Sequence, residues 1–299
     1  MNIVKVKGGL GNQMFQYAFG MMLQFTKGKT TRFDLYEYTT ALNKQGYTLR
    51  PYELAAFNTN IPVAERKYID KKLRPGRLRK LIQKATGTSL RHYYAPVIGY
   101  DVAALNLPGD AYFSGYFQSY KYYAGYEEQI RQLFEFNSAA IDSQNLQLTN
   151  EMTRCNSVSV HIRRGDYVND AAIQAAHETC TVDYYITCIE HMRRYIESPV
   201  FYFFSDDMEW VKQTFGSIKE QSYFMQHNTG SESWKDMYLM SKCKHHIIAN
   251  SSFSWWGAWL NSSPNKHVLA PNKWFNDEES NRIIADLIPA EWTLIPVRS

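Results

Sequence analysis

Short apolar segments alternate with longer amphipathic segments along much of the chain, and this pattern predicts an α/β protein with largely parallel sheets. At the start of the chain, residues 3–6 predict a strand and the glycine-rich residues 8–11 predict a tight turn. A helix is expected over residues 12–25, followed by a strand over residues 30–33 that ends at Asp34. The chain therefore begins with a predicted strand–helix–strand unit.

The alternation returns after residue 157 and predicts a second unit of the same class. Strands are expected over residues 158–162, 200–204, 246–249 and 267–270, and helices over residues 183–196, 231–243 and 253–261. Residues 138–155 are rich in Ser, Gln, Asn and Thr, which indicates a boundary. We predict an N-terminal α/β domain over residues 1–145 and a C-terminal Rossmann-like domain over residues 146–299.

The segment from residue 35 to residue 140 is predicted to be less regular, because prolines interrupt it and it is rich in tyrosine and basic residues. Most aromatic side chains of residues 112–126 are expected to pack in the core, and a minority to stack on sugar rings. The basic residues of segment 66–91 predict either a solvated helical face or a patch on the substrate side or facing a membrane, where it meets anionic lipid.

Composition narrows the class of protein further. Hydrophobic residues make up 44% of the 299 positions and charged residues 21%, which is typical of a folded globular protein. The net charge of +4 is too small to favour a nucleic-acid binder. The four cysteines form no CxxC pair, so neither a zinc site nor a disulfide framework is expected. We therefore expect reduced thiols. We expect no signal peptide. We also expect no membrane-spanning helix, because the helical segment at residues 14–25 is too short and too polar to cross a bilayer.

The sequence HIRRGDY at residues 161–167 directly follows a predicted strand, where ligands of open α/β sheets bind. The adjacent Arg163 and Arg164 repel each other unless an anion neutralises them, and guanidinium groups suit phosphate oxygens. Gly165 allows close backbone approach, and Asp166 is expected to pair with one arginine. The motif predicts an anion site. The alternative is a surface arginine pair bridged to Asp166.

Two acids follow the next predicted strand, in the sequence Ser205-Asp206-Asp207. A carboxylate at this position is suited to a guanine edge, to ribose hydroxyls or to a divalent metal. The adjacent acids lack the alternating Asp-x-Asp pattern of many metal-dependent glycosyltransferases. The alternative is that they cap the following helix, and we expect one of the two to do so.

A third motif, NSSFSWWGAW at residues 250–259, places three hydroxyl groups at a predicted helix start. These hydroxyls belong to Ser251, Ser252 and Ser254. Helix N-termini bind phosphate through unpaired N–H groups, whereas the tryptophans are expected to pack in the core. The turn at residues 8–13 matches neither GxGxxG nor a Walker A loop, and its Asn12 is expected to reach toward a substrate.

Taken together, these motifs resemble the bacterial α-1,2-fucosyltransferases of glycosyltransferase family 11. The resemblance spans nearly the whole chain, and HxRRGDY with NSSFSWWGAW is its most specific part. It implies a GT-B-like fold with two Rossmann-type domains facing a cleft. It also implies inverting, metal-independent transfer of fucose from GDP-β-L-fucose to the 2-hydroxyl of a terminal galactoside. Animal relatives carry an N-terminal membrane anchor that this chain lacks, so a bacterial enzyme is expected, cytoplasmic or peripheral on the inner face of the membrane.

The resemblance also implies residue roles. Arg163 and Arg164 are expected to hold the pyrophosphate, His161 and Asp206 to lie near guanosine, and Asn12 to act with the arginines. The expected donor site comprises Gly9, Gly11, His161, Arg163, Arg164, Asp206, Ser251, Ser252, Phe253 and Ser254. No metal ligand and no cofactor beyond the donor are expected.

The base that accepts the proton of the acceptor hydroxyl is left open. Asp170 is the first candidate and Asp34 another, whereas Asp166 is expected to be structural; the departing phosphate is a further possibility. The expected acceptor is a galactose-terminated glycan, such as a lipid-linked O-antigen repeat, a capsular unit or a lactose-like disaccharide. Residues 35–140 are expected to determine which acceptor the enzyme uses. The alternatives are another GDP-sugar transferase, a nucleotide-sugar hydrolase and a non-catalytic glycan-binding protein.

Overall fold

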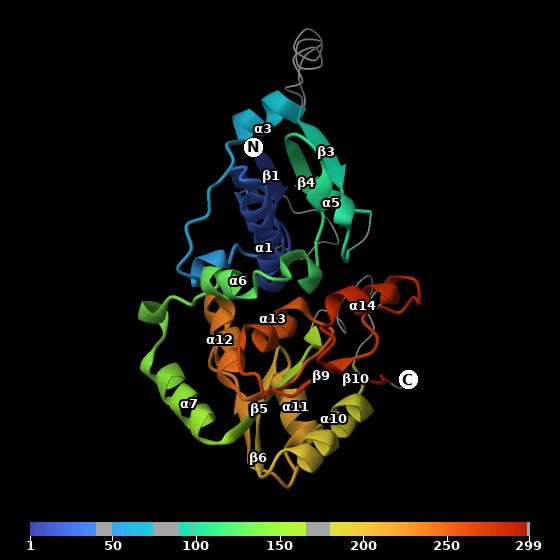
Figure 1. Cartoon of the computed structure of the whole chain (residues 1–299). Helices are drawn as coiled ribbons and strands as arrows, with labels where there is room; N and C mark the ends of the chain where they lie inside the picture. Colours follow the sequence, from blue (N-terminus) through green and yellow to red (C-terminus); the bar gives the residue numbers. More distant parts are fainter. Residues whose placement is uncertain (40–49, 74–89, 97, 166–179, 298–299) are drawn as a thin grey trace. The chain divides into compact units, whose positions relative to one another are not determined.

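The computed structural model describes residues 1–39, 50–73, 90–96, 98–165 and 180–297 (Figure 1). The chain divides into two compact units, Met1–Glu135 and Phe136–Ser299. Each unit is built on one parallel sheet with helices packed against it. This arrangement confirms the predicted α/β class.

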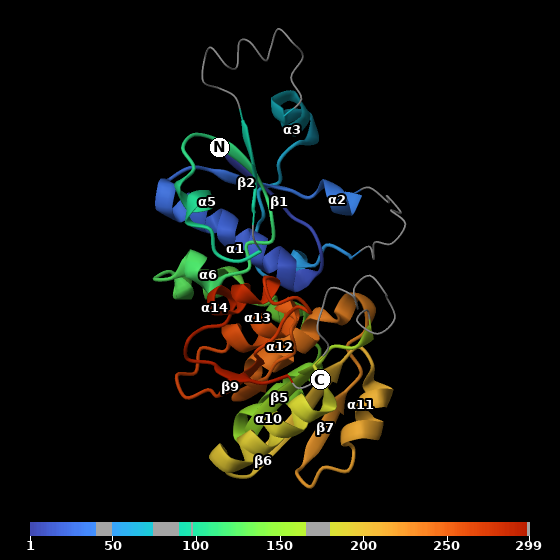
Figure 2. The same ribbon diagram turned by 90° about the vertical axis from the view of Figure 1, so that its right-hand side faces the viewer.

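The sheet of the N-terminal unit has four parallel strands in the order β2-β1-β4-β3. They are β1 (Asn2–Lys5), β2 (Thr31–Asp34), β3 (Arg91–Tyr94) and β4 (Ala111–Ser114). Helix α1 (Leu10–Lys27) joins β1 to β2 and packs against both, as Figure 2 shows, so the predicted strand–helix–strand start is confirmed. Strands β3 and β4 lie in the segment that was predicted to be less regular.

The other helices that the structure describes in the N-terminal unit are short. They are α2 (Tyr36–Thr39), α3 (Arg66–Leu73), α5 (Val102–Asn106), α6 (Glu127–Leu133) and the 3-10 helices η1 (Leu54–Ala56) and η2 (Tyr120–Tyr123). Helix α3 forms the first part of the basic segment and buries only Ile69, while its Arg66 pairs with Asp70. The rest of that segment up to residue 89 lies outside the described residues.

The sheet of the C-terminal unit has six parallel strands in the order β10-β9-β8-β5-β6-β7. They are β5 (Asn156–Ile162), β6 (Pro199–Ser205), β7 (Ser222–Met225), β8 (His245–Ile247), β9 (Val268–Pro271) and β10 (Thr293–Ile295). The central strand β5 pairs with β6 and β8, so the segments that follow these three strands meet at one edge of the sheet. The four strands predicted in this half are confirmed.

The helices described in this unit are α7 (Ser143–Arg154), α10 (Val182–Tyr195), α11 (Met208–Phe215), α12 (Trp234–Lys242), α13 (Ser252–Leu260) and α14 (Ile284–Leu287), with η3 (Ser138–Ala140), η4 (Gly230–Glu232) and η5 (Ser280–Ile283). The alternation along β5 assigns its two faces. Val158, Val160 and Ile162 join the apolar core that also contains residues of α10 and α11. The intervening Ser159 and His161 point to the opposite face, where α13 packs.

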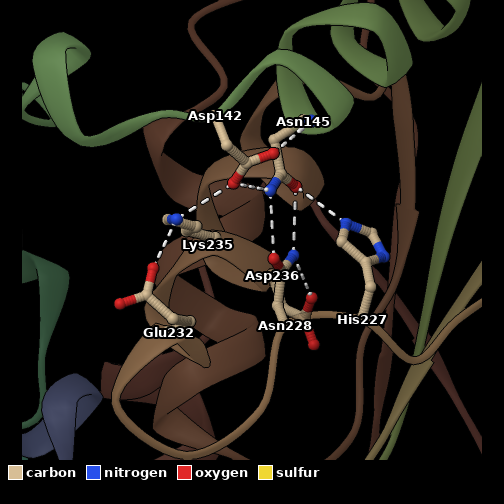
Figure 3. A network of polar contacts seen from close by, with 7 residues as sticks. All are labelled: Asp142, Asn145, His227, Asn228, Glu232, Lys235 and Asp236. Atoms are coloured by element: carbon tan, nitrogen blue, oxygen red, sulfur yellow. Dashed lines mark hydrogen bonds and ion pairs between the residues drawn. The ribbon is translucent and has the colours of Figure 1, made fainter.

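A network of polar side chains joins the start of α7 to the start of α12 (Figure 3). Asp142 caps α7 by accepting from the Asn145 backbone N–H, and it also accepts from Lys235 Nζ across 2.9 Å. Lys235 pairs with Glu232 as well, and the Asn145 amide bonds to the amide of Asn228. These contacts make α7 part of the C-terminal unit. The division therefore falls between residues 135 and 136, whereas the sequence placed it between residues 145 and 146.

In the portion of the chain that the structure describes, every helix is too short or too polar to traverse a lipid bilayer.

Candidate functional site

The loop after β5 is held by a carboxylate that follows the neighbouring strand β6. Arg163 Nη1 lies 2.7 Å from Asp206 Oδ2, and the Arg164 backbone N–H donates to Asp206 Oδ1 across 2.9 Å. A Cβ atom at Gly165 would lie only 2.7 Å from Asp206 Oδ2, so this contact requires glycine. Burial alone raises the pKa of Asp206, but Arg163 and the loop amides outweigh burial and hold the pKa below its ordinary value.

The second arginine is held by the second acid. Arg164 Nε lies 3.3 Å from Asp207 Oδ2, and its guanidinium carbon lies 3.8 Å from the centre of the Trp210 ring. Asp207 also caps α11, because its Oδ1 accepts from the Trp210 backbone N–H. The expectation that one of the two acids caps the following helix is confirmed. Each arginine of the motif thus has an acid of its own from the end of β6.

His161 lies buried at the end of β5 on the face opposite the main core of α10 and α11. Its ring centre is 5.7 Å from that of Phe253 in α13. Burial lowers the pKa of His161 below its ordinary value, so the imidazole is neutral at neutral pH. Its Nδ1 atom has no hydrogen-bond partner among the described residues. Because buried polar atoms are normally paired, this nitrogen is a candidate for contact with a ligand.

The three serines at the start of α13 differ in burial and in hydrogen bonding. Ser251 caps the helix by accepting from the Phe253 backbone N–H, and Ser252 lies half-buried beside it. Ser254 is buried, and its hydroxyl lies 3.2 Å and 3.1 Å from the carbonyl oxygens of Ala249 and Ser251. Its proton is therefore used inside the protein. The contact of the three hydroxyls with phosphate stays a prediction, and the internal hydrogen bonds of Ser254 make it the least suited of the three.

The tryptophans of the same helix pack in the core, as the sequence predicted. Trp255 and Trp256 are fully buried and Trp259 almost fully. Trp255 also donates through Nε1 to the Leu287 carbonyl oxygen across 2.8 Å. These contacts fix the orientation of α13, whose N-terminus lies at the edge of the sheet that carries Arg163.

Two adjacent tyrosines in the first turn of α10 fasten the strand ends that carry these motifs. Tyr185 donates through its hydroxyl to the His161 carbonyl oxygen across 3.2 Å. Tyr184 donates to the Ile248 carbonyl oxygen, directly after β8, across 2.7 Å. Sequence reasoning missed both residues. A pair of tyrosines at a helix start carries no local signal of which backbone its hydroxyls reach.

Asn12, placed in the catalytic set by the sequence, lies in the first turn of α1 in the N-terminal unit. Its Oδ1 accepts from Gln118 Nε2 across 2.6 Å, and Gln118 is itself buried. Gly8 has a φ of +81°, and a Cβ atom there would lie 2.8 Å from Asn12 Nδ2. Gly9 precedes α1 and Gly11 is buried in its first turn, so these two glycines belong to the same turn.

Of the three aspartates considered as proton acceptors, the structure describes Asp34 alone. Asp34 is buried, and both of its oxygens are engaged, Oδ2 by the Tyr112 hydroxyl at 2.6 Å and Oδ1 by the Tyr36 backbone N–H at 3.0 Å. Such a carboxylate is suited to a structural role. Asp166 and Asp170 lie outside the described residues. Across the described ranges, no three His, Cys, Asp or Glu side chains are grouped so as to hold a metal ion.

Comparison with known proteins gives the family to which this chain belongs. Residues 1–296 match the model of Glycosyl transferase family 11, so the chain belongs to that family. It is 35% identical to an α-1,2-colitosyltransferase of Escherichia coli, over 98% of both chains. It is 32% identical to the O-antigen biosynthesis glycosyltransferase WbnK of Escherichia coli, over 94% of this chain and 97% of that one. Among solved structures, the fucosyltransferase NodZ from Bradyrhizobium aligns over 86% of this chain and 91% of its own, with 14% identity and a TM-score of 0.49.

Proposed function

We propose that this protein transfers L-fucose from GDP-β-L-fucose to the 2-hydroxyl of a terminal galactoside, with inversion at the fucosyl carbon. The observation that carries the proposal is the arginine pair at the end of β5. Arg163 and Arg164 are held side by side by Asp206 and Asp207, next to the N-terminus of α13. Two fixed cations and a helix N-terminus suit a diphosphate.

The arrangement stabilises a departing nucleoside diphosphate. As the bond between fucosyl C1 and the phosphate oxygen breaks, negative charge grows on the β-phosphate. Guanidinium groups of Arg163 and Arg164 that are already oriented interact more strongly with this charge than with the intact donor, and such a difference accelerates the reaction. Loss of either guanidinium should therefore lower the turnover number more than it weakens binding of the intact donor.

The neutral, buried His161 suits the base of the nucleotide. A neutral imidazole offers one donor and one acceptor, and its Nδ1 has no partner among the described residues. The face of Phe253 lies beside it and provides an apolar wall. We assign His161 to the guanosine end of the donor site, and Arg163 and Arg164 to its diphosphate end.

The acceptor hydroxyl must lose a proton as the new glycosidic bond forms. Asp170 remains our candidate for the base, because it follows the arginine motif in the sequence. The engaged oxygens of Asp34 make it less suited. A pH–rate profile of Asp170→Asn tests this assignment. We expect the acid limb of the wild-type profile to disappear, and an unchanged acid limb would exclude Asp170.

For the acceptor, we propose a galactose-terminated glycan of the bacterial cell surface, such as an O-antigen repeat. The relative named for O-antigen biosynthesis, which matches this chain over nearly its full length, supports this choice. The aromatic segment between residues 35 and 140 supplies side chains suited to stacking on sugar rings.

A second donor is favoured by the relative at 35% identity, which is named a colitosyltransferase. The decisive experiment compares GDP-fucose with GDP-linked colitose on a panel of β-galactosides, with product linkage read by NMR. We expect an α-1,2-linked fucosyl product. Transfer of colitose without transfer of fucose would overturn the donor assignment, and a linkage at another hydroxyl would overturn the acceptor position.

A further inference from the structure

Trp210 lies in the first turn of α11 and has two surroundings. It packs against the core of the C-terminal unit, where its ring meets Phe215 edge to face at 6.0 Å. It also lies beneath the guanidinium of Arg164, whose central carbon is 3.8 Å from the ring centre. A ring anchored in the core therefore offers a fixed surface to a cation of the candidate site.

Asp207 completes the support of the same arginine. Its Oδ1 caps α11, its Oδ2 lies 3.3 Å from Arg164 Nε, and its backbone N–H donates to Ser205 Oγ across 3.0 Å. The carboxylate is thus held at both oxygens, and the backbone of Asp207 is held by Ser205. It engages one of the five N–H groups of the guanidinium, at Nε, and leaves the terminal nitrogens to other acceptors.

Stacking and the Nε contact together define one orientation. The ring of Trp210 determines the plane of the Arg164 guanidinium, and Asp207 determines its rotation within that plane. A long arginine side chain that is held in this way loses less conformational freedom when it binds an anion. We propose that Trp210 and Asp207 are positioning residues that orient Arg164 toward the diphosphate of the donor. This inference rests on the proposed function, which assigns Arg164 to that diphosphate.

The alternative role for Trp210 is packing alone. Both roles predict that a truncated side chain lowers stability, because Trp210 contacts Phe215 and the core. They differ in whether the effect on binding passes through Arg164. A double-mutant cycle makes this distinction, since two residues that act through one contact give non-additive effects.

The experiment measures GDP affinity by calorimetry for Trp210→Leu, Trp210→Phe and Asp207→Asn, each in the wild-type and in the Arg164→Ala background. The Asn variant keeps a good helix cap and removes the negative charge, so it separates capping from charge. We expect Trp210→Leu and Asp207→Asn each to weaken GDP binding by about tenfold in the wild-type background. Trp210→Phe should recover most of the loss. In the Arg164→Ala background, none of the three should have a further effect.

The matched control is Tyr36→Leu. Tyr36 also lies beneath an arginine, with the guanidinium carbon of Arg66 4.1 Å from its ring centre, but it belongs to α2 of the N-terminal unit. This variant should bind GDP with unchanged affinity. Thermal unfolding of every variant verifies that folded proteins are compared. If Trp210→Leu does not fold, the Trp210→Phe and Asp207→Asn variants still provide the test.

Two results would overturn the inference, and they are distinguishable. Equal losses from Trp210→Leu and Asp207→Asn in both backgrounds would show that these residues act through the fold rather than through Arg164. That result leaves the proposed function intact. Unchanged GDP affinity of Arg164→Ala alone would remove Arg164 from the diphosphate site, and with it the observation on which the proposed function rests.

Discussion

The side-chain amide of Gln118 donates to Asn12 Oδ1 across 2.6 Å, although the two residues are 106 positions apart in the sequence. The bond fixes which way the Asn12 amide faces at the first turn of α1. Gln118 follows Phe117, whose φ of +52° is rare for a bulky residue. Phe117 stacks on Phe19 of α1 with ring centres 3.9 Å apart. The strained residue is thus held by packing, and it places Gln118 beside Asn12.

Replacing Gln118 by Glu should lower the turnover number by about tenfold or more, because a carboxylate cannot donate to Asn12 Oδ1 and repels it. The measurement is steady-state transfer from GDP-fucose, with GDP affinity determined in parallel. We expect GDP affinity to remain unchanged, since Gln118 lies in the N-terminal unit and the arginine motif in the C-terminal unit. If Asn12→Ala lowers the turnover number and Gln118→Glu does not, Gln118 has no role in orienting Asn12.

The positive φ of Phe117 predicts that glycine at this position will give a more stable protein than alanine, the reverse of the usual order. Removing the buried ring should cost about 3–5 kcal/mol in either variant. Phe117→Gly should nevertheless unfold at a higher urea concentration than Phe117→Ala, because a left-handed φ disfavours alanine by about 1–2 kcal/mol. At Phe113, which is also buried but lies in β4, the usual order of Ala above Gly is expected. The same order at both positions would contradict the strain at Phe117.

The contact between Gly165 and Asp206 predicts that even a methyl group will disturb the arginine loop. Gly165→Ala places a Cβ atom 2.7 Å from Asp206 Oδ2, so the loop must shift and Arg163 loses its position. We expect GDP affinity to fall by about tenfold or more, a loss of about 1.4 kcal/mol, with little change in the melting temperature. Calorimetry and thermal unfolding measure the two quantities. Wild-type affinity in this variant would show that the loop tolerates a side chain at residue 165.

Asp236, in the first turn of α12, predicts a stability that depends on pH (Figure 3). Burial raises its pKa to about 7, although the hydrogen bond from Asn228 acts in the opposite direction. The folded chain therefore binds this proton more tightly than the unfolded chain does. The stabilisation by this proton is complete below the ordinary pKa of 3.8 and disappears as pH rises through about 7.

It follows that Asp236→Asn should melt at a higher temperature than the wild type at about pH 8, and that this difference should vanish near pH 4. The asparagine carries no charge and its oxygen still accepts from Asn228. The matched control is Asp183→Asn, which removes an exposed acid from the first turn of α10 and should give no stabilisation at the higher pH. A wild-type melting temperature above that of Asp236→Asn at about pH 8 would refute the prediction.

Much of the local structure could be predicted because it depends on neighbouring residues. The alternation of side chains over residues 158–162 gave the strand that leads to the arginines, and the acids after β6 gave a helix cap at Asp207. In contrast, β3 and β4 were not predicted. Their sequences, RHYY and AYFS, mix aromatic, basic and small residues and lack a continuous apolar run.

The sequence by itself determined the α/β class, the order of most strands and helices in the C-terminal half, and the motifs that place the chain in its family. Only the tertiary structure decided which partner each functional side chain has. It pairs Arg163 with Asp206, stacks Arg164 on Trp210 and bonds Gln118 to Asn12. The reason is physical: the periodicity of a strand or helix depends on near neighbours, whereas these contacts join segments that meet only when separate strands pair in a sheet and helices pack against it.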